Sequence, residues 1–260
     1  MLKYERIASY QQVKYSLHLP QFLSYLVTGK VYSDITSIGC HTCLWDFGKN
    51  GYHDWVYAEK INEKLTPIFP CSETVEASIQ GKIIRSGAGL HDSSAALIPY
   101  LANFSEPFIL LSTGTWCISL NPFSNKPLTA EELKNDCLCY IEYGGHPVKA
   151  SRLFAGNEHE MQVKILAEHF DVDLDDYKKI VFTPALVKRI ENDNEATKAG
   201  VQASHFSTRE LNDFNSYEEA YHMLIHDIIQ QQKFSTSLVL SQQTHTRIFV
   251  DGGVAKNHVY

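Results

Sequence analysis

The chain has 260 residues, of which 44% are hydrophobic and 12% aromatic, so it is long enough to bury a sizeable core. Its formal net charge is −7, which gives no positive field to hold a nucleic-acid backbone or an anionic membrane surface. No apolar run approaches the ~20 residues that cross a bilayer, and Met1 is followed by Leu-Lys-Tyr-Glu-Arg and not by an apolar leader. We therefore expect a globular protein of the cytoplasm that binds neither nucleic acid nor membrane.

Six cysteines are too sparse for the disulfide framework of a small secreted domain, so reduced thiols are expected. Cys40 and Cys43 have the spacing of a metal knuckle or redox pair, with Cys137 and Cys139 as conceivable partners. The second pair has the wrong gap, and residues 37–47 alternate as in a strand or are irregular. We predict no metal site. A metal-dependent redox protein remains a competing interpretation that the zinc content of the purified protein would test.

The first part of the chain predicts two helices. A short helix is expected within residues 16–29, because Pro20 stands in its first turn and Gly29 past its end. A turn at residues 50–51 precedes a second, amphipathic helix, capped by Asp54 and running to about residue 64.

A strand, a glycine turn and a helix are predicted next. Residues 82–89 favour a strand that ends in the turn, and Ser93 begins the helix. Asp92 lies in this turn, at the kind of strand end where α/β sheets bind ligands. Two further β runs, within residues 108–120, flank the small residues 112–115 and predict a hairpin.

The second part predicts long helices and a last strand. Residues 151–170 carry an apolar stripe on a charged helix, interpreted as packing only. Residues 171–215 are charged and polar, and no chemistry can be inferred there. A long helix is expected over 217–234, and a strand over 246–251 ends at a pair of glycines, with a further helix after them.

Three short, polar, glycine-rich segments follow predicted strands, at residues 89–96, 111–116 and 250–257. Each alone is weak evidence, because hairpins, tight connections and helix caps use the same residues. Together, in this order and with these separations, they resemble the FGGY carbohydrate kinases. The resemblance covers most of the chain and also includes residues 22–30, Trp45-Asp46, Trp55 and Pro127-Leu-Thr. The turn Ser-Thr-Gly-Thr-Trp is similar to that of the rhamnulokinase branch, within a rhamnulokinase- or xylulokinase-like family.

This resemblance implies an α/β, actin-like (ribonuclease H-like) ATPase fold whose two domains close over ATP and a sugar. Residues 1–103 would be the C-terminal part of the first FGGY domain, and residues 104–260 an incomplete N-terminal part of the second. The family normally opens with an Asp-x-Gly-Thr hairpin that binds Mg²⁺ and the terminal phosphates, and none precedes Asp92. We therefore expect a fragment, truncated at both ends and inactive by itself, because it lacks that phosphate clamp.

The resemblance assigns the catalytic role to Asp92. Its carboxylate would take the proton of the sugar hydroxyl as the γ-phosphoryl group transfers, since that hydroxyl is a poor nucleophile at neutral pH. His91 would donate a hydrogen bond to the sugar, with a packed or solvated histidine as the alternative.

The nucleotide site is implied by two further segments. Thr113, Gly114 and Thr115 would present hydroxyls and amides to the phosphates of ATP. Gly252 and Gly253 would leave room for the flat nucleoside, with Asn257 on the following helix. Asp251 ranks lower, as a cap of that helix.

The predicted reaction is ATP-dependent phosphorylation of a sugar hydroxyl, with ATP and Mg²⁺ as cofactors. The acceptor is a ketose such as rhamnulose or xylulose, or a polyol. The longer parent protein is compatible with a homodimer. The alternative is a catalytically inactive actin-like module that binds a nucleotide or sugar. For Lys149 and Arg152 we expect surface or packing roles ahead of phosphate binding, and His159 does not begin a zinc-protease helix, because position 163 is Val.

Overall fold

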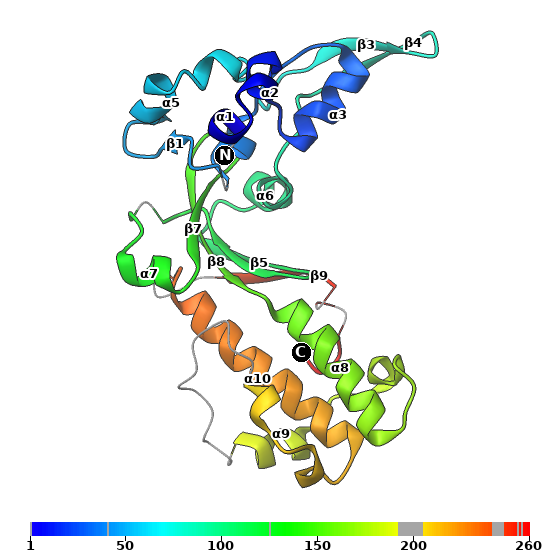
Figure 1. Ribbon diagram of the computed structural model, residues 1–260. Helices are drawn as coiled ribbons and strands as arrows, with labels where there is room; N and C mark the ends of the chain where they lie inside the picture. The colour runs from blue at the N-terminus through cyan, green and yellow to red at the C-terminus, as the bar shows by residue number, and fades with distance from the viewer. Residues whose placement is uncertain are drawn as a thin grey trace. The chain divides into compact units, whose positions relative to one another are not determined.

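The structure is a computed structural model that describes residues 2–40, 42–124, 126–191, 205–240, 247–253, 255 and 257–260 (Figure 1). The chain divides into two compact units. The first comprises Met1–Ser105 and Cys139–Val148, and the second comprises Glu106–Leu138 and Lys149–Tyr260. Both units combine helices with strands, which confirms the predicted α/β class.

Short helices and two small hairpins build the first unit. Its helices are α1 (Leu2–Glu5), α2 (Ile7–Gln12), α3 (Leu19–Thr28), α4 (Ile35–Ile38), α5 (Asp54–Ala58) and α6 (Asp92–Asn103), with a 3-10 turn at Asn62–Lys64. Its antiparallel hairpins pair β1 (Trp45–Asp46) with β2 (Gly51–Tyr52), and β3 (Val75–Ile79) with β4 (Lys82–Ser86). Blue to cyan-green ribbons mark these elements in Figure 1.

Helix α3 confirms the first helix prediction. Pro20 lies in its first turn, and Gly29 ends it in the left-handed conformation at φ 68°. The second prediction is wrong in length, because α5 ends at Ala58 and Lys60 then takes a positive φ of 53°. Asp54 is the first helical residue and not the cap, and its carboxylate pairs with a lysine of the preceding loop.

The strand, turn and helix around Asp92 are confirmed as β4 and α6. The sequence did not reveal β3, the hairpin partner of β4. Among the described residues of the range 37–47, the strand is the two-residue β1, and α4 extends to Ile38, so the alternating pattern there does not form a continuous strand. On α6, the buried Ser94 hydroxyl donates to the Ile141 carbonyl at 2.8 Å, which fixes the start of this helix within the first unit.

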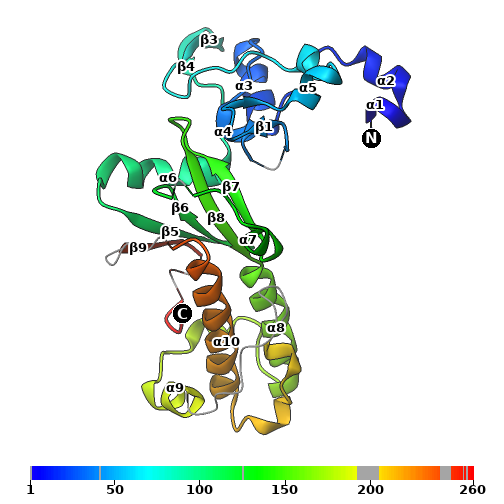
Figure 2. The same ribbon diagram turned by 90° about the vertical axis from the view of Figure 1, so that its left-hand side faces the viewer.

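A five-stranded sheet forms one layer of the molecule (Figure 2). Its strands are β5 (Phe108–Thr113), β6 (Cys117–Asn121), β7 (Cys137–Ile141), β8 (Pro147–Leu153) and β9 (Arg247–Gly252), in the order β7-β8-β6-β5-β9. The predicted hairpin is confirmed as β5 and β6, which pair antiparallel with Thr113 opposite Cys117. Strand β9 confirms the last predicted strand and pairs parallel to β5, although Thr246 of that prediction lies outside the described residues.

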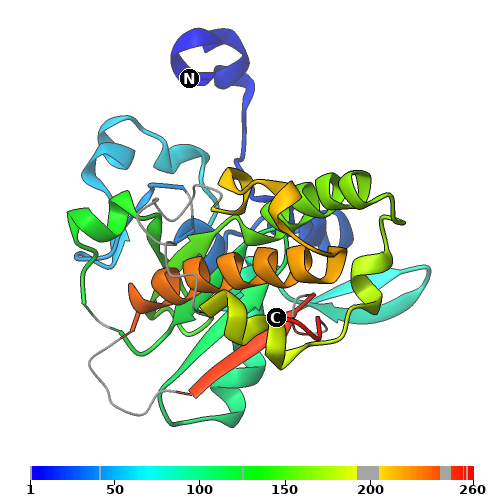
Figure 3. The same cartoon turned by 90° about the horizontal axis from the view of Figure 1, so that it is seen from below.

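Helices of the second unit are α7 (Ala130–Lys134), α8 (Ala155–Phe170), α9 (Pro184–Glu191) and α10 (Tyr217–Ser237), with 3-10 turns at Asp176–Lys179, Phe206–Thr208 and Leu211–Asp213. Helix α10 confirms the long helix predicted over 217–234 and packs along α8 (Figure 3). The helix predicted over 151–170 is wrong at its start, because Ser151 to Leu153 belong to β8 and pair with β6. Residues 192–204 of the charged region lie outside the described residues.

The core of the second unit lies between the sheet and the two long helices. Leu166 of α8, Tyr221 and Leu224 of α10, and Cys117 of β6 are fully buried in it. Each such apolar side chain contributes about 1.5–3 kcal/mol through burial, which holds α8 and α10 against the strand ends. None of the helices in the described part of the chain combines the length and the apolar character needed to span a bilayer.

Candidate functional site

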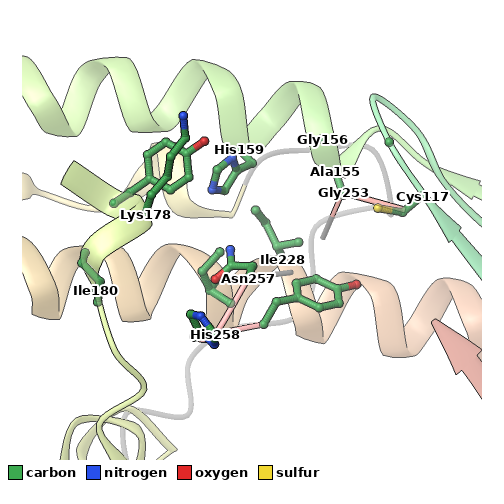
Figure 4. A pocket seen from close by; sticks show the side chains of 14 residues that line it. Cys117, Ala155, Gly156, His159, Lys178, Ile180, Ile228, Gly253, Asn257 and His258 are labelled. Atoms are coloured by element: carbon green, nitrogen blue, oxygen red, sulfur yellow. The ribbon is translucent and has the colours of Figure 1, made fainter. Parts of the chain in front are cut away.

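A cavity of about 530 Å³ opens in the second unit (Figure 4). This volume lies in the range of about 300–1,000 Å³ that is usual for small-molecule sites. Its lining comes from six segments of the second unit and comprises Gly114, Cys117, Ala155, Gly156, His159, Tyr177, Lys178, Ile180, Ile225, Ile228, Gly253, Asn257, His258 and Tyr260. Three residues predicted for the nucleotide site, Gly114, Gly253 and Asn257, therefore line one cavity.

One end of the cavity is formed by three backbone segments in close contact: the β5–β6 turn, the start of α8 and the end of β9. The Asn157 amide donates to the Thr115 carbonyl at 3.2 Å, and the Gly253 amide donates to the Thr113 carbonyl at 3.2 Å. A Cβ at Gly156 would overlap the carbonyl oxygen of Gly114. Only glycine at position 156 lets α8 approach the turn this closely.

The end of β9 is equally constrained. Gly252 has φ 94°, and a Cβ there would overlap the carbonyl oxygen of Thr113. The buried Thr113 hydroxyl donates to the Asp251 carbonyl at 2.6 Å, so in this structure it ties the two parallel strand ends together. Thr115 and Gly114 are exposed on the turn. Asp251 accepts the Gly252 amide at 2.7 Å through its carboxylate.

Three polar side chains meet in the wall of the cavity. The Asn257 side-chain amide donates to the Tyr221 hydroxyl at 2.8 Å, and Nε2 of His159 lies 3.0 Å from the same oxygen. Burial lowers the pKa of His159 and raises the pKa of Tyr221, because both charged forms lose solvation. Burial likewise raises the pKa of Cys117 to about 11, so this lining thiol is protonated at neutral pH.

Several lining residues were missed by the sequence. His159 lies on a helix interpreted as packing only, whereas Tyr177, Lys178 and Ile180 lie in the charged region where no chemistry was inferred. Figure 4 shows His159, Lys178 and Ile180 toward one end of the cavity and Cys117 and Gly253 toward the other. No local pattern marks the missed residues, because they reach the cavity only where the segment 177–180 packs against α8 and α10.

Asn257 does not lie on a helix as predicted. Among residues 253, 255 and 257–260 no α-helix is formed, and Val254 and Lys256 of the motif lie outside the described residues. The side-chain oxygen Oδ1 of Asn257 instead accepts the Val259 amide at 3.0 Å, which closes a local turn. This turn orients the side-chain amide toward Tyr221 without helical support.

Asp92, the predicted catalytic base, lies in the first unit as the first residue of α6. Its side chain is 92% exposed, and Oδ1 accepts the Ser93 amide at 2.6 Å. One carboxylate oxygen thus satisfies the helix start, and the exposed side chain is accessible to a substrate. The predicted nucleotide residues belong to the second unit.

His91 precedes Asp92 and is held by its neighbours. Its amide donates to the Thr36 hydroxyl at 2.9 Å, and that hydroxyl donates in turn to the buried carboxylate of Asp34. Its Nε2 lies 3.2 Å from Sγ of the buried Cys40. Burial lowers the pKa of His91, although the Asp92 carboxylate opposes this shift. A rigid polar network therefore fixes the backbone just before the carboxylate.

Two basic residues considered for phosphate binding are engaged elsewhere. The Lys149 ammonium is buried and pairs with Glu132. The Arg152 guanidinium donates to Asp136 at 2.5 Å and stacks 5.0 Å from the centre of the Trp116 ring. Their packing roles are confirmed, while a surface role for Lys149 is wrong.

The described residues contain no group of three or more His, Cys, Asp or Glu side chains that could hold a metal ion. Within that part of the chain, Cys40 and Cys43 therefore belong to no such group.

Comparisons with known proteins agree with this architecture. Residues 105–191 match the model of the C-terminal domain of the FGGY carbohydrate kinases. A carbohydrate kinase from Novosphingobium aromaticivorans is similar in structure with a TM-score of 0.70 and 25% identity, over 94% of this chain and 55% of that one. A search of the curated proteins finds no match.

Two further solved structures share the fold at lower identity. The ligand-bound xylulose kinase from Lactobacillus acidophilus has a TM-score of 0.67 at 15% identity, over 99% of this chain and 55% of its own. The gluconate kinase from the same organism has a TM-score of 0.64 at 14% identity, with the same coverage. The chain thus spans about half the length of the kinases that it matches.

The mixed sheet, the position of the glycine turns and the shared fold confirm the predicted actin-like architecture. Residues 105–191 thus match the C-terminal domain of the FGGY carbohydrate kinases, and the chain shares the fold of solved carbohydrate kinases over nearly its whole length.

Proposed function

We propose that this chain carries the adenosine-binding cavity and the catalytic base of an ATP-dependent carbohydrate kinase. The observation that supports this most is the cavity itself, because Gly114 and Gly253, predicted from distant segments, line it together with Asn257. The apolar Ile225 and Ile228 side chains offer a surface for a flat base. The exposed turn at residues 114–115 lies at the end of the cavity where phosphates would follow the nucleoside.

In the proposed reaction, Asp92 takes the proton of the sugar hydroxyl as that oxygen attacks the γ-phosphorus and the bond to ADP breaks. The exposed carboxylate at the start of α6 suits this role, because the sugar can reach it from solvent. His91 would contact a sugar hydroxyl, with its backbone held by Thr36.

The acceptor is proposed to be a ketose such as rhamnulose or xylulose, or a polyol. The Ser-Thr-Gly-Thr-Trp turn supports the rhamnulokinase side of this range, and the second similar structure named above is a xylulose kinase. A cytoplasmic location, a lack of nucleic-acid and membrane partners, a homodimer and the domain boundary at 103–104 remain predictions.

The nucleotide site can be tested on the 260-residue protein by thermal unfolding. Saturating ATP is expected to raise the melting temperature by several degrees, since a ligand at about 100 times its Kd adds about 2.7 kcal/mol of stability. Gly253→Val should abolish this shift by filling the cavity. Gly51→Val is the matched control, because both glycines lack a positive φ and have no close neighbour at the Cβ position.

An unchanged melting temperature with ATP, or an ATP shift that survives in Gly253→Val, would contradict the site.

The same protein is expected to show no sugar phosphorylation by itself, because its sequence holds no Asp-x-Gly-Thr turn. Substantial turnover in a coupled ADP assay would refute that second expectation.

The alternative function, an actin-like binding module without catalysis, shares the cavity and differs only in the role of Asp92. A specific observation favours the kinase: the carboxylate is exposed and bears no ion pair to a Lys or Arg within the described residues.

A further inference from the structure

The hydroxyl of Tyr221 is a junction between three parts of the second unit. It comes from α10 and is 0% exposed, yet it contacts His159 of α8 and Asn257 of the C-terminal segment. Asn257 has no helix to hold it, so this hydroxyl is the contact that joins its side chain to the helical core. The junction forms part of the cavity wall, because His159 and Asn257 both line the cavity.

The order of protons along this junction follows from its geometry. The side-chain oxygen Oδ1 of Asn257 accepts the Val259 amide. The other end of the same side chain, its NH₂ group, must therefore face Tyr221. The Tyr221 oxygen therefore accepts from Asn257, and its own hydrogen is left for Nε2 of His159. Nε2 can accept this hydrogen only when it carries no proton, which requires the neutral Nδ1–H tautomer.

We propose that His159 is a positioning residue for nucleotide binding: through the Tyr221 hydroxyl it holds Asn257 in place only while its imidazole is neutral, which makes adenosine affinity depend on pH. This inference rests on the proposed nucleotide site and adds a regulatory property to it. If His159 becomes protonated, Nε2–H and the Asn257 amide both point donors at one oxygen. The Tyr221 hydroxyl hydrogen then has no acceptor in a buried site, which destabilises the arrangement.

The groups that surround His159 do not replace it in this role. Tyr177 packs its ring 5.0 Å from the imidazole, and Lys178 beside it pairs with Asp175 at 2.7 Å. Burial raises the pKa of Tyr260 in the cavity wall, so it stays neutral together with Tyr221. His258 is the second titratable imidazole of the lining, and the test must separate it from His159.

The direction of the pH effect can be worked out from His159. Because burial lowers its pKa, the neutral form persists to a pH below the usual value for histidine, about 6.5. Adenosine affinity is therefore expected to be constant above that value. It falls once the pH passes below the lowered pKa, where the imidazolium forms and the junction is lost.

Binding of adenosine to the 260-residue protein at about pH 8 and at a pH below the His159 pKa, which nitrogen NMR of the ring locates, tests the proposal, because adenosine lacks the phosphate group that titrates near pH 6. The wild type is expected to bind about tenfold more weakly at the lower pH, as expected for one lost buried hydrogen bond. His159→Gln, whose amide oxygen can still accept, should bind equally at both values. Tyr221→Phe should bind about tenfold more weakly at both.

His169→Gln is the matched control, since His169 lies exposed on the same helix away from the cavity and should behave as the wild type. His258→Gln should keep the pH dependence. A wild-type affinity that is equal at both values, or a pH dependence retained in His159→Gln, overturns the inference but leaves the nucleotide site intact. Absence of adenosine and ATP binding at either pH overturns the proposed function, and the inference with it.

Nitrogen NMR of the histidine rings provides a readout without nucleotide. At about pH 8 the His159 ring is expected as the Nδ1–H tautomer, with a pKa below the usual histidine value of about 6.5. Tyr221→Phe should change the tautomer balance of His159 but not that of the histidines outside the cavity. An Nε2–H tautomer in the wild type would overturn the proton order on which the proposal depends.

Discussion

Replacing Asp92 with Asn is expected to lower kcat for sugar phosphorylation by about 10²–10⁴-fold, the usual contribution of a general base. The measurement needs a kinase-active polypeptide that contains these residues together with an Asp-x-Gly-Thr turn. The amide is isosteric with the carboxylate but cannot take the proton of the attacking hydroxyl. Adenosine affinity should not change, because the cavity belongs to the second unit. This separates loss of chemistry from loss of binding.

The chain offers a close control in Asp54. Like Asp92, it is the first residue of a helix, follows a histidine and is highly exposed, at 85%. Each carboxylate lies at the positive end of a helix dipole on an exposed side chain, so both Asn variants should lose only a small amount of stability. Only Asp92→Asn should lose turnover. If Asp54→Asn were equally impaired, or Asp92→Asn fully active, a different residue would be the base and the inactive binding module would gain support.

Around Asp92, the sequence predicted the local strand, turn and helix but not the distant residues that hold them in place. The strand, turn and helix were predictable because glycine and the helix-starting residues act within a few positions of one another. The network behind His91 joins Thr36 and Asp34, more than 50 residues upstream. Nothing in the sequence distinguishes Asp34 from an ordinary polar residue. Only in the folded protein is its carboxylate buried, where it accepts the hydrogen bond from Thr36.

The cavity likewise combines residues whose position the sequence predicted with residues whose role it did not reveal. Gly114 and Gly253 stand in turns with a recognisable sequence, so their place at strand ends was predictable. Tyr221 and His159 occupy helices whose periodicity marks only the buried face. A buried tyrosine reads as core in the sequence, because nothing local shows that its hydroxyl meets Asn257 from a segment 36 residues away.

Gly252→Ala is expected to destabilise the second unit by about 3 kcal/mol or more, which lowers the melting temperature by roughly 6–12 °C. At φ 94° an alanine is strained, and its Cβ would overlap the Thr113 carbonyl oxygen. Relief requires β9 to move away from β5, where Gly252 and Thr113 are paired in register. The Thr113 hydroxyl would then lose the Asp251 carbonyl, and the end of the cavity would open.

Gly253→Ala separates this strain from a general sensitivity of the turn. Its Cβ would meet nothing within 4 Å, and its φ is not in the left-handed region, so the change in stability should stay within about 1 kcal/mol. Its methyl group enters the cavity, so adenosine affinity should fall although the fold is retained. Thermal unfolding and adenosine binding of the two variants distinguish the roles: equal melting temperatures would show that Gly252 is not required for the close approach of β9 to β5.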